Sequence, residues 1–227
     1  MSIRQDRPVE RVLTLWSVTE PTGNPQLTCR SVRVSPYLVT VPSASQKAGP
    51  TLATGDARAR NAVFSGGSIW FAFASSHQSG AAVSAARWLQ LDPSAGQSVQ
   101  EGSFAVPDIH HCYPALVPDM HGNAALVVGR SGPAELVSLQ LTARRAGDPP
   151  NELPPSRAVH EGTAVHDNPV RHGRNRWGLS HRGSRPLRRG HHLDLRRLSD
   201  LAEGLDHLRG RDPHLTVGAL TPAPNPT

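Results

Sequence analysis

The chain has 227 residues, of which 37% are hydrophobic and 4% aromatic, and it contains 20 glycines and 21 prolines. This abundance of turn-forming residues favours short strands over long helices, and no apolar run is long enough for a secretory signal or a membrane span. The formal net charge of +6 comes from 24 basic residues of which only Lys47 is a lysine, so a GC-rich genome explains the arginine excess as readily as a nucleic-acid partner does.

Residues 1–49 contain two short apolar segments, VERVLTLWSV (9–18) and RSVRVSPYLVTV (30–41). The alternation of valines in the second segment is typical of strands, so we expect a partial N-terminal blade and a linker here. The chain has two cysteines, Cys29 and Cys112. They allow one disulfide but form no disulfide framework.

Residues 50–178 repeat a recognisable unit. NAVFSGGSIWFAF (61–73) and YPALVPDMHGNAALVV (113–128) each consist of a strand, a tight turn and a second strand. Each is followed by further strands: ARWLQLD (86–92) with SVQEGSFAV (98–106), and ELVSLQLT (135–142) before a Pro-rich loop. Four strands in a unit of about 50 residues is typical of a β-propeller blade, so we expect an all-β fold of four-stranded antiparallel blades.

The ordered series QKAGPTLATGDARARNAVFSGGSIWFAF, AARWLQLD, HHCYPALVPDMHGNAALVVGRSGPAE, GDPP and GRNRWG resembles a family of bacterial, exported β-propellers with sialidase-like architecture. The resemblance covers about residues 28–178. It implies an extracellular or cell-surface binding or scaffold protein, although this chain carries no signal peptide and is cytoplasmic as written. In that family the segment after RNRWG continues with further strands, whereas this chain departs from the pattern at Leu179.

Residues 179–227 form an Arg/His/Leu-rich tail with no aromatic residue. With one choice of synonymous codons, HHLDLRRLS read one base along becomes Ile-Ile-Trp-Ile-Tyr-Ala-Asp-Tyr, an aromatic strand of the kind that the resemblance implies there. One hypothesis is therefore a frameshift near Trp177–Leu179, which leaves an incomplete propeller followed by an unrelated segment. The alternative is a genuine basic tail, irregular or partly helical, because Leu195, Leu198 and Leu205 recur at helical spacing.

The sequence offers weak signals for metal or nucleic-acid binding. His110, His111 and Cys112 are metal-ligand types, with Asp119 and His121 nearby, but neighbouring residues of a strand point to opposite faces. We therefore interpret DMHGN as a hairpin turn and expect neither a metal nor another cofactor. Nucleic-acid binding through the basic tail is an alternative function, but basic charge alone gives nonspecific, salt-sensitive affinity.

A polar cluster precedes the first strand of each unit. In a propeller, equivalent strand ends gather round one mouth of the central channel, so we expect these clusters to face one another and form a ligand site. Arginine there would hold a carboxylate, and Tyr or Trp would stack on a sugar ring, which makes a carbohydrate or a small anion the expected partner. The candidate residues are Asp56, Arg58, Arg60, His111, Tyr113, Arg174, Asn175, Arg176 and Trp177.

The enzymatic alternative is a sialidase-like glycoside hydrolase. Glycosidases need two carboxylates at a set separation, and the spacing of Asp56, Asp108 and Glu135 selects no pair. Phosphate-binding loops and Gly-x-Ser-x-Gly elbows are absent from the sequence. The sequence therefore names no catalytic residue and favours a binding role.

Overall fold

The protein folds into antiparallel β-structure throughout its described part. The computed structural model describes residues 9–59, 61–79, 81–167, 169–170, 174–175 and 177. No helix occurs among these residues, so the all-β prediction is confirmed for them, and none of their elements is a helix long and apolar enough to cross a membrane. The tail 179–227, expected to be irregular or partly helical, lies outside the described residues.

Short turns connect most of the consecutive strands. They are β1 (Val9–Thr19), β2 (Gln26–Leu38), β3 (Asn61–Ser65), β4 (Ser68–Ser79), β5 (Ala81–Asp92), β6 (Gln97–Phe104), β7 (His110–Pro118), β8 (Ala124–Gly132), β9 (Glu135–Arg144), β10 (Arg157–His160), β11 (Pro169–Val170) and β12 (Arg174–Asn175).

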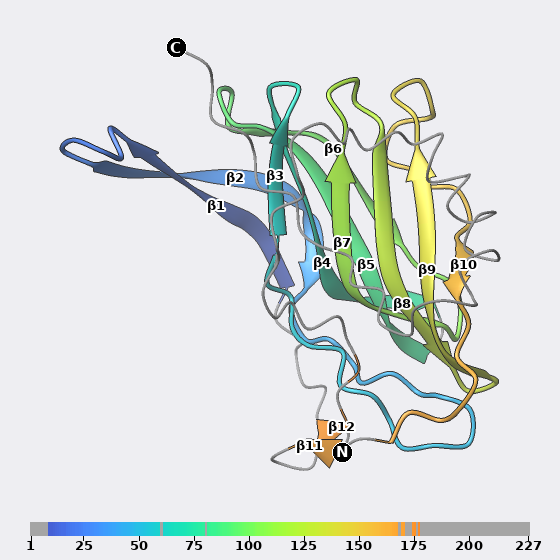
Figure 1. Cartoon of the computed structure of the whole chain (residues 1–227). Coiled ribbons are helices and arrows are strands. Elements are labelled where there is room, and N and C mark those ends of the chain that lie inside the picture. The colour runs from blue at the N-terminus through green and yellow to red at the C-terminus, as the bar shows by residue number, and fades with distance from the viewer. Residues whose placement is uncertain are drawn as a thin grey trace. The chain divides into compact units, whose positions relative to one another are not determined.

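Two sheets contain the long strands (Figure 1). The six-stranded sheet has the order β1-β2-β4-β5-β6, with β3 paired to β4, and the four-stranded sheet has the order β10-β9-β8-β7. Strands β3 to β6 are therefore a meander of consecutive antiparallel neighbours, and so are β7 to β10. Strand β2 joins the first meander through one pairing, Leu38 with Ser76.

Both predicted hairpins are confirmed, and the turn residues explain them. Gly66 and Gly67 connect β3 to β4 with φ of 57° and 76°, a region that glycine enters without steric cost. Between β7 and β8, the Asp119 carboxylate accepts hydrogen bonds from the backbone N–H groups of His121 (2.8 Å) and Asn123 (3.0 Å). These side-chain hydrogen bonds take the place of the backbone hydrogen bonds between strands that are lost in the turn.

The two meanders pack face to face around two tryptophans. Trp70 of β4 and Trp88 of β5 are each 1% exposed, and their rings stack with centroids 6.4 Å apart. Leu116, Leu126 and Val128 of the second sheet complete this cluster. Burial of these large side chains holds the sheets together through the hydrophobic effect.

The opposite face of β4 and β5 is also buried. Phe71 and Phe73 of β4 pack with Leu89 of β5 against Val32 and Val34 of β2. A strand that is covered on both faces has no solvent side, which explains why residues 69–74 of β4 (IWFAFA) are continuously apolar and not alternating.

A buried ion pair fixes β2 against β5 and β6. The side chains of Arg87 and Glu101 form a salt bridge and are 9% and 17% exposed. Arg87 also donates to the carbonyl oxygens of Ser35 (2.8 Å) and Pro36 (3.3 Å), while Glu101 accepts from the Ser35 N–H (2.8 Å) and hydroxyl (2.9 Å). These bonds hold the two charged groups in place and align the elements, while the Arg87 Nε is buried without a hydrogen-bond partner among the described residues.

Two phenylalanine-to-alanine substitutions test the double-sided burial. Phe73 is 2% exposed and Phe64 is 65% exposed. We expect Phe73→Ala to lower the free energy of unfolding by about 3–5 kcal/mol, because it leaves a cavity, and Phe64→Ala to change it by less than about 0.5 kcal/mol. Urea unfolding followed by tryptophan fluorescence measures both, and equal effects would contradict the packing.

Candidate functional site

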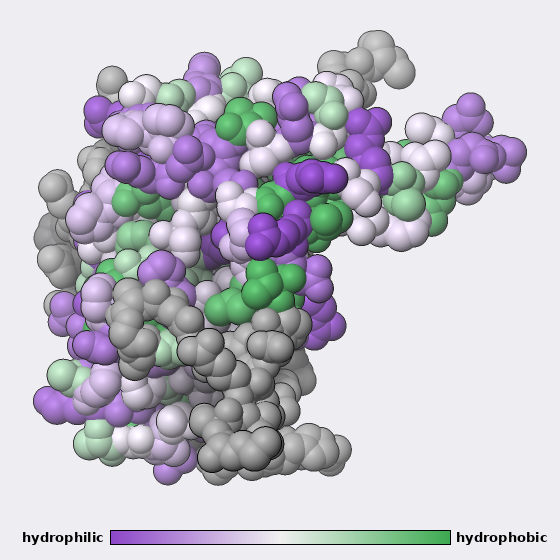
Figure 2. Space-filling view, turned by 180° about the vertical axis from the view of Figure 1, so that it is seen from behind, coloured by the Kyte–Doolittle hydropathy of each residue, from purple (hydrophilic) through white to green (hydrophobic). Residues whose placement is uncertain are grey.

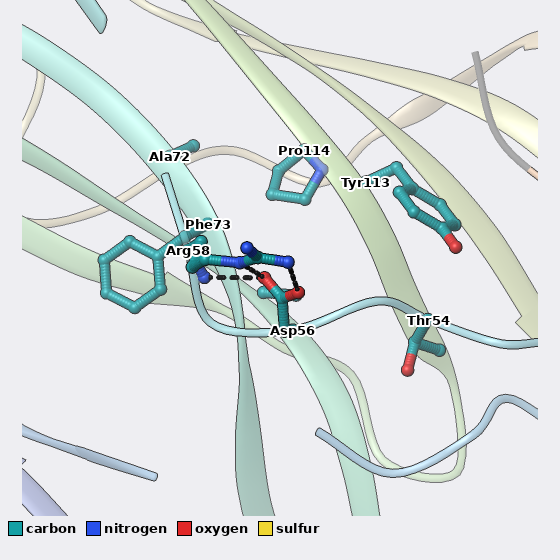
Figure 3. A pocket seen from close by; sticks show the side chains of 8 residues that line it. Thr54, Asp56, Arg58, Ala72, Phe73, Tyr113 and Pro114 are labelled. Atoms are coloured by element: carbon teal, nitrogen blue, oxygen red, sulfur yellow. Dashed lines mark hydrogen bonds and ion pairs between the residues drawn. The ribbon is translucent and has the colours of Figure 1, made fainter. Parts of the chain in front are cut away.

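A shallow depression lies where the segment before β3 meets β7 (Figure 3). Its polar side chains come from that segment, its base comes from β4, and it encloses no space for a water molecule. The lining residues are Thr54, Asp56, Arg58, Ala72, Phe73, Ala74, Tyr113 and Pro114. The structure thus brings together three of the predicted site residues, Asp56, Arg58 and Tyr113, around this shallow depression.

Asp56 holds Arg58 in a two-bond ion pair. The Arg58 Nε donates to Oδ1 at 3.0 Å and its Nη2 donates to Oδ2 at 2.6 Å, as the dashed lines in Figure 3 show. The hydrogen bond and the charge of Asp56 raise the pKa of Arg58. A guanidinium has five N–H donors, and the Arg58 side chain is 83% exposed, so it presents oriented donors to solvent.

Ala53 joins the three repeat-related clusters through its backbone. The Tyr113 hydroxyl donates to the Ala53 carbonyl oxygen at 2.7 Å, and the Ala53 N–H donates to the Asn175 carbonyl oxygen at 2.8 Å. The Asn175 side chain in turn donates to the His166 carbonyl oxygen at 2.7 Å. Three segments about 60 residues apart, namely 53–58, β7 and β12, are therefore linked through Ala53.

The backbone of Tyr113 directs its ring towards this point. Tyr113 has a φ of 51°, and the pairing of β7 with β8 is irregular between Cys112 and Ala115. A non-glycine residue in the left-handed region is uncommon and needs support from its surroundings. Here the hydroxyl bond to Ala53 contributes that support.

Two predicted site residues lie elsewhere in the structure. His111 is completely buried beside Phe104, with 4.8 Å between the ring centroids. Trp177 is half-buried and covers Gly129, where a Cβ atom would overlap its ring. Both side chains are packing residues. Their position in the repeat does not determine which face of the sheet they occupy.

The remaining arginines of the predicted site are incompletely described. Arg60 and Arg176 lie outside the described residues. Arg174 pairs with Val170 through the backbone of β11 and β12. Among the described residues of the predicted site, Asp56, Arg58 and Tyr113 therefore line the depression, and Asn175 is linked to it through its backbone bond to Ala53.

The metal-ligand types of β7 do not converge within the described part of the chain. The Ser84 N–H donates to His110 Nδ1 at 3.1 Å, and Asp119 accepts the hydrogen bonds of its own turn. Among the described residues, no group of three His, Cys, Asp or Glu side chains is placed to hold an ion. Both cysteines are free; Cys29 is exposed, and burial raises the pKa of Cys112 to about 12.

Sequence reasoning missed Thr54, Pro114 and the backbone of Ala53. The Thr54 hydroxyl donates to the Pro42 carbonyl oxygen at 2.8 Å, which ties the depression to the linker before it. These residues have no charge and belong to no motif. Only the register between distant segments reveals them.

His111 is a buried titratable side chain of β7 whose pKa is strongly lowered. Neither ring nitrogen has a hydrogen-bond partner among the described residues. Burial, with the charge of Arg130 as a smaller cause, lowers its pKa to about 4. Nearby, Arg130 donates to Glu135 at 2.7 and 2.8 Å, so that carboxylate is engaged elsewhere and its pKa is lowered.

Comparison with protein-family models, with curated protein sequences and with solved structures finds no match for this chain. The candidate site is therefore argued from its own geometry.

The burial of His111 predicts a pH-dependent stability. Its pKa is about 4 in the folded chain against 6.5 when unfolded, so the unfolded chain binds the proton more tightly. Stability from this group is complete above pH 6.5 and is lost as the pH falls towards 4. The loss amounts to about 3 kcal/mol from the two pKa values.

His111→Leu removes this titration and keeps a buried side chain of similar size. The free energy of unfolding of wild type and variant, measured by urea unfolding at pH 7.5 and at pH 4, should diverge because only the wild type is destabilised through His111. Titrations of surface carboxylates that do not interact with His111 cancel in the difference, whereas Glu135 is coupled to His111 and contributes to it. Parallel pH profiles would contradict the buried neutral imidazole.

Proposed function

We propose that the two four-stranded meanders are adjacent blades of a β-propeller and that the chain works as a binding module. The meander order β3 to β6 and β7 to β10, and the face-to-face packing of the two, support this proposal. An extracellular or cell-surface location is part of the same proposal. It rests on the resemblance of residues 28–178.

The meeting of the three repeat-related clusters at Ala53 carries the proposal. Equivalent loops of successive blades come together at one end of a propeller, and ligands bind in such concave places. Asp56 and Arg58 lie on one of these segments, Tyr113 on the next and Asn175 on the third. A binding surface elsewhere on the chain would not require these three segments to meet.

The chemistry of the depression favours a small anionic or sugar-acid ligand. Arg58 is oriented by Asp56 and is largely exposed, so it can donate to a carboxylate without first losing much side-chain freedom. The half-buried ring of Tyr113 adds an apolar surface on which a sugar ring can rest. Among the described lining residues Asp56 is the single carboxylate, whereas glycoside hydrolysis uses two, so we propose binding without hydrolysis.

Glucuronic acid and glucose form a matched pair of probes, because they differ in one carboxylate. We expect glucuronic acid to bind the full chain more tightly than glucose, in titrations followed by NMR chemical shifts. Arg58→Gln should weaken glucuronic acid binding about tenfold, since a charged hydrogen bond contributes about 1.5–3 kcal/mol.

Arg145→Gln is the control, because Arg145 is also exposed and the substitution changes the net charge equally. Equal losses in the two variants would show that general charge and not the cluster attracts the anion. Absence of binding by either sugar would count against this ligand class.

Tyr113→Phe should lower the free energy of unfolding by about 1 kcal/mol, because it removes the hydrogen bond from the Tyr113 hydroxyl to the Ala53 carbonyl oxygen.

A further inference from the structure

Strand β1 is a long edge strand with little protection. No other described strand pairs with its outer side, and it has 11 residues. Edge strands are usually protected by short length, lysine, proline or a bulge. The β1 bulge lies near its start, between Glu10 and Val12, and residues 12–19 (VLTLWSVT) contain neither a charge nor a proline. This part of the edge is therefore suited to pair with another strand.

The outward face of the β1–β2 hairpin carries several exposed apolar side chains, although Arg33 and Ser31 of β2 lie on the same face. Val12, Trp16 and Val18 are 43%, 59% and 55% exposed, and Leu27, opposite Val18 on β2, is 63% exposed. In Figure 2 the hairpin carries hydrophobic surface behind a polar tip. Aromatic and aliphatic side chains in this number are typical of a contact surface.

The opposite face of β1 continues into the core. Leu13 and Leu15 are partly buried and pack against the cluster of Val32, Phe71 and Phe73. A strand added beside β1 would cover the remaining surface of both leucines. The edge thus extends an interface that already exists within the chain.

We propose that β1 pairs with β1 of a second copy of this chain, in an antiparallel two-fold ladder centred on Thr14. This register places Val12 opposite Trp16 of the second copy and Leu13 opposite its Leu15. Because directly opposite residues share a face, the outward apolar residues meet one another and so do the core-facing leucines.

Residues 12–16 (VLTLW) are apolar on both sides of Thr14, and this self-complementarity favours a second copy as the partner. Symmetry makes each contact twice, and it places Arg11 opposite Ser17 and Glu10 opposite Val18, so like charges do not face each other. The pairing also satisfies the free backbone groups of both edges. Because each copy uses its β1 edge once, the assembly stops at a dimer.

Light scattering with size-exclusion chromatography tests the dimer on the full chain. We expect the wild type to dimerise, and Trp16→Lys to become monomeric because it places a charge opposite Val12 of the second copy. Leu27→Lys is the control, since it charges an equally exposed position of the same face on β2, away from the edge. A monomeric wild type, or equal disruption by both variants, would overturn edge pairing. Thermal unfolding confirms that each variant is folded.

A cysteine scan tests the register. In a Cys29→Ser background the one remaining native thiol, Cys112, is 1% exposed. Thr14→Cys places two thiols across the two-fold axis, with Cα atoms about 4.5–5.5 Å apart, within the span of a disulfide. Copper–phenanthroline, the oxidant, removes two electrons and two protons per bond, so Thr14→Cys should yield a covalent dimer.

Val18→Cys is the matched control, because it lies on the same face but is about 27 Å from its own symmetry mate in this register. It should remain uncrosslinked. Crosslinking of both variants to the same extent would exclude the register. Crosslinking of Val18→Cys alone would exclude it as well.

Discussion

Burial of β4 and β5 on both faces is the constraint on which the rest of the structure depends. Trp70 and Trp88 fill one side and Phe71 and Phe73 fill the other, so both sides need a covering layer. The second meander supplies one layer and the β1–β2 hairpin supplies part of the other. A sheet of this kind is stable only within a stack of sheets, because each exposed apolar face would otherwise meet water.

Polar contacts then align what the hydrophobic layers hold together. The Arg87–Glu101 pair fixes β2, and the hydrogen bonds at Ala53 fix the segment before β3 against β7 and β12. Hydrophobic contact is nondirectional, whereas these bonds demand a particular geometry. The position of Asp56 and Arg58 beside Tyr113 follows from this alignment, so the candidate site is a product of the stacking and not of a local motif.

The proposed ligand site and the proposed dimer edge use different properties of the chain. The depression has a rigid base of buried β4 residues and an ion pair that orients one exposed arginine. The edge of β1 instead offers backbone groups and apolar side chains beyond the stacked sheets. The two sites lie on separate elements, so binding at one does not require contact at the other.

The sequence by itself determined the strands and their turns. The glycines at 66 and 67 and the Asp119 turn have local causes, and the repeat of strand pairs predicted which segments are equivalent. The repeat also predicted that the clusters at 56–58, 113 and 175 approach one another. These features depend on near neighbours in the chain or on periodicity, which a sequence displays directly.

Only the tertiary structure decided which face each side chain occupies. His111 and Trp177 stand at repeat positions like those of Tyr113, yet they are packed against Phe104 and Gly129. The irregular pairing after Cys112 and the positive φ of Tyr113 change the direction of successive side chains, and nothing in the sequence marks that change. Likewise, the role of Ala53 comes from backbone groups that every residue has, so only the register between distant strands could select it.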